Sequence, residues 1–210
     1  MNRPTLEAEL ALYQQGYRFV AGVDEAGRGA WAGPVVAAAV ILSLACPKMA
    51  QMLDGVRDSK QLTPLQRQVQ YEVVSRSAAD LGVGLATAGE IDKVGIVPAT
   101  RLAMQRALAH LSLPPDYLVI DYVRLADVDI PQLVEAKADG RYLSVAAASI
   151  IAKVFRDRLM TMYEERYPDY GFAAHKGYGT ARHRAELESC GPTPIHRLSF
   201  APLRDLQSLE

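Results

Sequence analysis

The most constraining feature of this chain is a nearly unbroken apolar run from Pro34 to Leu42, which follows a shorter run from Phe19 to Val23. A strand with one solvent-exposed face alternates apolar and polar residues, whereas a continuous apolar run is typical of a strand covered on both faces. The connection between the two runs is short, so we expect them to pair as a hairpin. The pattern therefore predicts a sheet with helices packed on both sides.

Further elements follow from hydrophobic spacing and from turn residues. Thr63 and Pro64 suit the N-cap and first position of a helix, and Pro114-Pro115 closes another. We expect helices over 6–15, 64–79, from about 93 to 111, over 145–167 and over 181–189, and further strands over 83–86, 117–120 and 133–138. This order of elements predicts an α/β fold with a mixed five-stranded sheet.

Length and composition are those of an ordinary globular protein. The chain has 210 residues, of which 50% are hydrophobic and 22% charged, with a formal net charge of −1. We expect one domain, with a core over 1–167 and a small helical extension over 168–210. The near-neutral charge gives no overall basic signature, although a local basic face suffices to bind nucleic acid.

Two absences bear on location. The N-terminus carries no apolar signal core, and no apolar run is long enough to span a bilayer. Cys46 and Cys190 lie far apart and fit neither a disulfide framework nor a zinc spacing. We expect a soluble cytoplasmic monomer that has inert thiols and no membrane partner.

Acidic residues follow three of the predicted strands. Asp24-Glu25 follows the first strand, Asp121 the fourth and Asp139 the fifth. Strands that end at one sheet edge bring their terminal side chains together, and four carboxylates there repel each other unless a cation compensates. Oxygen-only ligands select Mg²⁺ or Mn²⁺ over zinc, and a pair of such ions suits phosphoryl transfer.

This interpretation has one difficulty and one bland alternative. Adjacent strand residues face opposite sides, so Asp24 and Glu25 reach one site only if the strand ends or bulges there. The glycines at 27 and 29 would make such a break easy. Taken alone, each acid is better explained as a solvated surface residue or a cap.

Taken together, the motifs resemble bacterial ribonuclease HII, a family within the ribonuclease H-like nucleases. The resemblance extends from about Val20 to Pro202. It is carried by residues 23–29 (Val-Asp-Glu-Ala-Gly-Arg-Gly), 58–60 (Asp-Ser-Lys), 90–92 (Glu-Ile-Asp), 120–121 (Ile-Asp), 137–139 (Lys-Ala-Asp), 146–154 with Arg156-Asp157, and 175–178 (His-Lys-Gly-Tyr). The order and spacing of these segments are more specific than any one of them.

The resemblance implies an endonuclease that cuts the RNA strand of RNA·DNA hybrids, including single ribonucleotides embedded in duplex DNA, and leaves 3′-hydroxyl and 5′-phosphate ends. It implies that the metal ligands, and hence the catalytic residues, are Asp24, Glu25, Asp121 and Asp139. Gly27, Arg28 and Gly29 would contact the ribose 2′-hydroxyl through backbone groups, and Tyr178 would stack on the next sugar.

Other polar residues fit phosphate contacts, with surface roles as the alternative. Lys60 and Lys176 are of this kind. Ser149 and Lys153 lie four residues apart on one helix face, where they either contact phosphate or solvate the helix. His175 and His183 match no zinc spacing, so we expect loop or helix positions, with phosphate contact left open.

The chain also departs from the family pattern. Asp121 is followed by Tyr122-Val123 where Gly-Asn is usual, Trp31 lies in the second turn where Pro-Leu is usual, Gln61 replaces a common lysine, and Ala138 replaces a glycine. No predicted ligand is lost.

Two alternatives remain: a junction resolvase-like DNA nuclease of the same fold, and a non-catalytic hybrid-binding protein. A sliding clamp is left open as a partner, because residues 203–210 show no clear docking motif.

Overall fold

The computed structural model describes residues 3–207 and has one five-stranded sheet in the order β3-β2-β1-β4-β5. The strands are β1 (Val20–Ala26), β2 (Val35–Leu42), β3 (Ala78–Ala86), β4 (Tyr117–Asp121) and β5 (Gln132–Glu135). Strands β1, β2 and β3 are antiparallel neighbours, while β4 runs parallel to both β1 and β5. The predicted mixed sheet and the pairing of the first two strands are confirmed.

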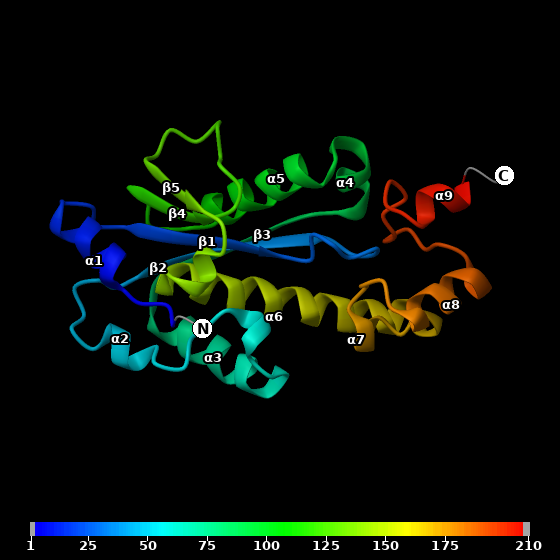
Figure 1. Ribbon diagram of the computed structural model, residues 1–210, viewed down its shortest axis with the longest axis horizontal. Coiled ribbons are helices and arrows are strands. Elements are labelled where there is room, and N and C mark those ends of the chain that lie inside the picture. Colours follow the sequence, from blue (N-terminus) through cyan, green and yellow to red (C-terminus); the bar gives the residue numbers. More distant parts are fainter. Residues whose placement is uncertain (1–2, 208–210) are drawn as a thin grey trace.

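Helices cover both faces of the sheet (Figure 1). The long helix α6 (Leu143–Arg166) packs on β1 and β2 from one side, and α5 (Ile96–Ala109) packs on β2 and β3 from the other. The remaining helices are α1 (Glu7–Gln14), α2 (Met49–Met52), α3 (Pro64–Ser77), α4 (Ala88–Val94), α7 (Phe172–His175), α8 (Ala181–Cys190) and α9 (Leu203–Gln207), with the 3₁₀ turns η1 (Ser59–Gln61), η2 (Ala138–Gly140) and η3 (Pro168–Tyr170).

Strand β2 is completely buried, as its apolar run predicts. Its alternate residues divide between two hydrophobic clusters. Ala38, Val40 and Leu42 pack beside α6, whereas Ala37, Ala39 and Ile41 pack beside α5. Burial on both faces explains why the run has no polar positions.

Some element boundaries differ from the sequence-based prediction. Strand β1 does not end at the acids but runs on to Ala26 in regular register, because Asp24 and Glu25 pair with Ala38 and Ala37 of β2. Strand β3 begins at Ala78, directly after α3, and is longer than predicted. Strand β5 ends at Glu135, so Asp139 lies on the 3₁₀ turn η2 and not at a strand end.

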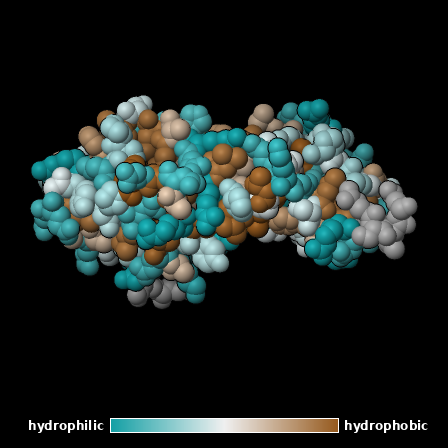
Figure 2. All heavy atoms as spheres, turned by 90° about the horizontal axis from the view of Figure 1, so that it is seen from above, coloured by the Kyte–Doolittle hydropathy of each residue, from teal (hydrophilic) through white to brown (hydrophobic). Residues whose placement is uncertain are grey.

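The segment after α6 forms one end of the molecule (Figure 1), and this end is narrower than the end that contains the sheet (Figure 2). Sequence spacing predicted only one helix in this segment, which is α8.

Cys46 and Cys190 are free thiols, the second of them exposed. Within residues 3–207, no helix combines the length and the apolar character that crossing a membrane requires.

Candidate active site

The candidate acids meet where β1 and β4 lie side by side. Val23 of β1 is the partner of Ile120 of β4, so Asp24 and Asp121, the next residues on the two parallel strands, are neighbours. Asp139 joins them from η2, because the Asp121 carboxylate accepts a hydrogen bond from the Ala138 amide at 2.9 Å. Segments far apart in the chain thus bring four carboxylates to one edge of the sheet.

The acids on β1 are buried away from water and repel each other electrostatically. Burial raises the pKa of Asp24 well above its usual range, and Glu25, Asp121 and Asp139 raise it further by repulsion. Burial also raises the pKa of Glu25, although the Arg28 guanidinium, 3.2 Å from Glu25 Oε1, opposes that shift. Asp24 and Glu25 therefore both lie within electrostatic reach of Asp121, although the strand neither ends nor bulges between them.

A fifth carboxylate, which the sequence analysis did not assign to the site, belongs to Asp58. It caps η1 by accepting a hydrogen bond from the Lys60 amide, and it lies near enough to Asp139 to affect the pKa of that residue. Burial, together with repulsion from Asp58 and Asp121, raises the pKa of Asp139 to about 6. Lys60 is the nearby cation, with Nζ 3.9 Å from Asp139 Oδ2 and a largely exposed side chain.

The donor set fits a hard divalent cation. All the candidate ligands are carboxylate oxygens, and Glu25 Oε2 is a buried acceptor with no hydrogen-bond partner among the described residues. In this conformation no three acidic, histidine or cysteine side chains within residues 3–207 are grouped tightly enough to enclose an ion. Binding of a cation would therefore require these side chains to move closer together.

The Gly27-Arg28-Gly29 loop rests on two buried arginines that the sequence analysis did not assign to the site. Arg197 donates hydrogen bonds to the Gly27 and Arg28 carbonyls at 2.7 and 2.8 Å. Arg156 packs directly beneath Gly27 and binds the carbonyls of Ala32, Pro34 and Lys176. In the described part of the chain, no carboxylate lies within ion-pair distance of either guanidinium; burial lowers the pKa of Arg156 and lowers that of Arg197 to about 9.

Tyr122 occupies the position at which the chain departs from the family pattern. Its φ of 63° is left-handed, a conformation that glycine adopts without strain and a bulky residue does not. Its exposed ring lies under the Arg28 guanidinium, 4.6 Å from Cζ to the ring centroid. Arg28 is thus held between Glu25 and Tyr122.

A pocket of about 520 Å³ joins the acids to the loop. Glu25 and Asp121 line it together with Lys60, Lys153 and Tyr178, and residues 26–29 form part of its wall. The centroid of the Tyr178 ring lies 5.4 Å from Lys153 Nζ and 5.3 Å from Arg156 Cζ. An adjoining pocket of about 530 Å³ contains Asp58, Asp121 and Asp139.

Two predicted substrate contacts lie elsewhere. Ser149 is buried and donates a hydrogen bond to Ser59 Oγ at 2.8 Å, so it supports a residue of the pocket wall without lining the pocket. Lys176 lies in a neighbouring pocket, with Nζ 2.8 Å from Thr161 Oγ1. Of the eight predicted contact residues, the pocket wall gathers the other six: Gly27, Arg28, Gly29, Lys60, Lys153 and Tyr178.

Three of the four histidines form a buried cluster in the C-terminal segment. His175 and His183 stack at 4.3 Å between ring centroids, and His183 Nε2 lies 3.0 Å from His196 Nε2. Trp31, another departure from the family pattern, packs against His183 at 5.5 Å. The cluster is therefore part of the packing that joins the loop before β2 to α8.

Comparisons with known proteins agree with this geometry. Residues 21–203 match the family model described as Ribonuclease HII. A ribonuclease HII of Roseiflexus castenholzii is 57% identical over 97% of this chain and 91% of its own length, and one of Chloroflexus aggregans is 52% identical over 98% and 97%.

Solved structures give the same result. The ribonuclease H2 of Pyrococcus horikoshii superposes with a TM-score of 0.74 at 32% identity, covering 90% of this chain and 97% of that one. Ribonuclease HII of Archaeoglobus fulgidus, in a structure of its complex with PCNA, gives 0.72 at 28% identity over 87% and 95%.

The strand order and the acidic sheet edge define a nuclease with the ribonuclease H-like fold. The chain belongs to the ribonuclease HII family, whose members are ribonuclease H type 2 endonucleases.

Proposed function

We propose that this chain cuts the RNA strand of RNA·DNA hybrids, and cuts 5′ of single ribonucleotides embedded in duplex DNA, with Mg²⁺ or Mn²⁺ as cofactor. The observation that carries the proposal is the shared pocket, in which Glu25 and Asp121 open onto the same space as the Gly27-Arg28-Gly29 loop. A phosphate next to a ribose would meet the acids while its sugar meets the loop.

Under this proposal Asp24, Glu25, Asp121 and Asp139 hold two divalent ions. When bound, such ions lower the pKa of the attacking water and neutralise charge on the leaving 3′-oxygen. The protein contributes desolvated carboxylates that repel one another, which favours binding of a cation. The products would carry 3′-hydroxyl and 5′-phosphate ends.

Ribose recognition is assigned to the loop and to Tyr178. The 2′-hydroxyl distinguishes RNA from DNA at a single position, so a reader of ribonucleotides needs rigid polar backbone groups near it. Arg156 packs under Gly27, and Arg197 holds two of the loop carbonyls. The Tyr178 ring, which lies near Lys153 and Arg156, would offer a flat surface to the adjacent sugar.

The substitution Asp121→Asn tests this proposal. We expect it to reduce cleavage of a duplex that contains one ribonucleotide by at least 100-fold while binding is retained, because it removes a ligand charge and keeps the side-chain shape. Asp127→Asn, which alters an exposed acid beyond β4, is the matched control and should cleave like the parent. Cleavage and end chemistry are read on a denaturing gel.

Substrate choice separates the alternatives. Equal cutting of an all-DNA duplex by the parent protein would favour a DNA nuclease, and binding without cutting in Mg²⁺ or Mn²⁺ would favour a hybrid-binding protein.

We further propose that the chain acts as a monomer, which light scattering during gel filtration measures. The archaeal complex favours a sliding clamp as a partner; co-elution with the clamp of the same organism would test it.

A further inference from the structure

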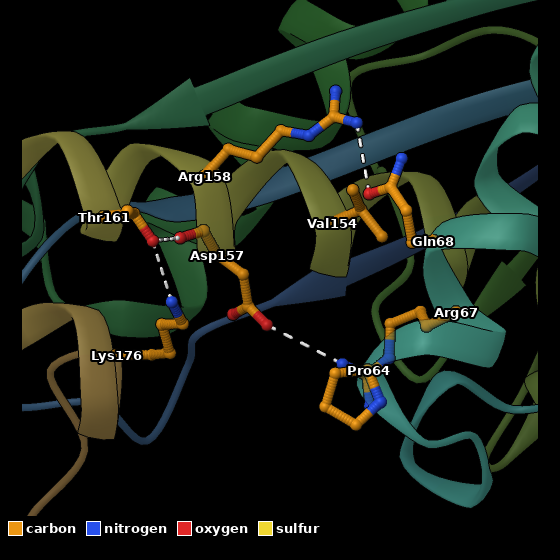
Figure 3. A pocket seen from close by; sticks show the side chains of 8 residues that line it. All are labelled: Pro64, Arg67, Gln68, Val154, Asp157, Arg158, Thr161 and Lys176. Carbon is orange, nitrogen blue, oxygen red and sulfur yellow. Dashed lines mark hydrogen bonds and ion pairs between the residues drawn. The ribbon is translucent and has the colours of Figure 1, made fainter.

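The pocket that contains Lys176, of about 350 Å³, lies between α3 and α6 outside the acidic site and is called the second pocket below (Figure 3). Its walls carry Pro64, Arg67 and Gln68 of α3, Val154, Asp157, Arg158 and Thr161 of α6, and Lys176 from the turn after α7. None of these side chains is a candidate metal ligand, and only Lys176 was predicted to contact substrate. The pocket therefore calls for an explanation of its own.

This pocket continues the active-site pocket along one face of α6. Residues 149, 153, 157 and 161 lie four apart, so their side chains form one row on the helix. Lys153 lines the active-site pocket, whereas Asp157 and Thr161 line the second one. Asp157 links the two, with its oxygens 2.7 Å from Lys153 Nζ and 3.7 Å from Arg67 Nη1.

The second pocket is rich in cations. Arg67, Arg158 and Lys176 line it, opposed by the single carboxylate of Asp157. Arg67 has a structural task, because it donates hydrogen bonds to the Ser59 and Leu62 carbonyls. Arg158 and Lys176 have neutral hydrogen-bond partners in the structure, Gln68 and Thr161, as Figure 3 shows.

We propose that the pocket between α3 and α6 binds a backbone phosphate of the same nucleic-acid duplex, several nucleotides from the cleaved bond. Arg158 and Lys176 supply the charge, while Gln68 and Thr161 hold their head groups in place. This site rests on the proposed function, since its ligand is the substrate that also occupies the active-site pocket.

Its position argues for a phosphate of the duplex over a free anion. Along α6, Lys153 and Thr161 are separated by roughly 12 Å, at about 1.5 Å per residue. A strand of a duplex advances about 3.4 Å per nucleotide. The second pocket therefore lies about three to four nucleotides from the first, within one continuous bound strand.

Duplex length provides the sharpest test. Binding is measured by fluorescence anisotropy in EDTA, which prevents cleavage, for the parent and for Arg158→Gln, Lys176→Gln and the double variant. One duplex extends eight base pairs on both sides of a single ribonucleotide. Each of two shorter duplexes keeps eight base pairs on one side and ends two base pairs from the ribonucleotide on the other, one on its 5′ side and one on its 3′ side. We expect each single variant to bind the long duplex about 3- to 10-fold more weakly and to reduce the slope of log K against log salt by about 1.

The shorter duplexes should separate the two strand directions. On the duplex that lacks the side reaching the second pocket, the variants and the parent should bind alike. Lys93→Gln, on α4 across the sheet, is the matched charge control and should not discriminate between duplexes. Arg158→Lys and Lys176→Arg should restore the salt slope, and thermal unfolding shows whether each variant is folded.

Each outcome is decisive. If folded variants bind the long duplex within twofold of the parent, or lose equal affinity on all three duplexes, the phosphate site is wrong while the proposed function stands. If the parent itself binds none of these duplexes, the proposed function fails and the phosphate site fails with it.

Discussion

Gly27 and Gly29 flank the same arginine, yet an added methyl group would meet very different surroundings at the two positions. At Gly27, with φ of 92°, a Cβ would lie 1.9 Å from Arg156 Nε, whereas at Gly29 nothing lies within 4 Å. A buried guanidinium held by three carbonyls cannot move aside easily. Gly27 is thus required by packing as well as by its backbone angle.

We predict that Gly27→Ala lowers the free energy of unfolding by about 2–4 kcal/mol, because it combines a clash with a strained φ. Gly29→Ala, the matched control, should change it by less than about 1 kcal/mol. Urea unfolding followed by circular dichroism measures both. Equal stability of the two variants would contradict the packing of Arg156 under the loop.

Tyr122 leads to a prediction about Arg28. Tyr122→Gly removes the ring under the guanidinium and relieves the left-handed backbone, so stability should change by less than about 1 kcal/mol. The lost cation–π contact, about 0.5–1 kcal/mol, should raise KM for the one-ribonucleotide duplex by about 2- to 5-fold. Tyr122→Phe keeps the ring and should match the parent in steady-state cleavage assays. An unchanged KM for Tyr122→Gly would show that the stacking does not position Arg28.

At the scale of elements, the spacing of hydrophobic residues predicted the sheet well but predicted the ends of its strands poorly. The apolar run of β2 needs cover on both faces, and the structure supplies it. The extension of β1 through Asp24 and Glu25 depends on pairing with β2, which is a tertiary contact and leaves no mark in the local pattern. Asp139 was assigned to a strand end because the apolar residues before it resemble a strand, but the chain turns into η2 there.

The part of the candidate site whose residue types indicate its chemistry could be predicted from the sequence. Acids next to apolar strands stand out, and the structure brings Asp24, Glu25, Asp121 and Asp139 to one edge. Their roles as ligands remain a prediction. Arg156 and Arg197 could not be assigned to the loop, because an arginine that binds only carbonyls of distant segments has no local signature.

The buried histidines lead to a prediction about pH. Burial lowers the pKa of His196 from 6.5 to about 4, with the neighbouring His183 adding to the shift. Between pH 6.5 and 4 the unfolded chain binds more protons than the folded one, so this histidine's contribution, up to about 3 kcal/mol, is lost as pH falls. It is fully present above pH 6.5.

We therefore expect His196→Gln to be less stable than the parent at pH 7 and to lose less stability on going from pH 7 to pH 5. Urea unfolding at the two pH values measures the difference. The comparison between variant and parent isolates His196 from the buried acids, whose raised pKa values act in the opposite direction. Parallel pH profiles would show that His196 does not titrate differently on folding.

At the scale of the whole molecule, the nearly balanced net charge hides a separation of acidic and basic residues. The formal net charge is −1, yet acids concentrate at one sheet edge while two arginines and one lysine line the pocket between α3 and α6. The C-terminal segment joins this arrangement through Arg197, which reaches from beyond α8 to the loop after β1. We therefore expect the division into a core and an extension to be one of sequence order more than of independent folding.

The two guanidinium groups under the loop have a consequence for long-range attraction. Their hydrogen bonds go to neutral carbonyls, and within residues 3–207 no carboxylate forms an ion pair with either group, so their charge is only partly offset by Asp92 and Asp157. An approaching nucleic-acid strand would be attracted by two fixed cations behind the peptide groups at 27 and 28, even at ionic strengths that screen the surface lysines. The scaffold itself would then draw the strand toward an acidic centre that would otherwise repel it.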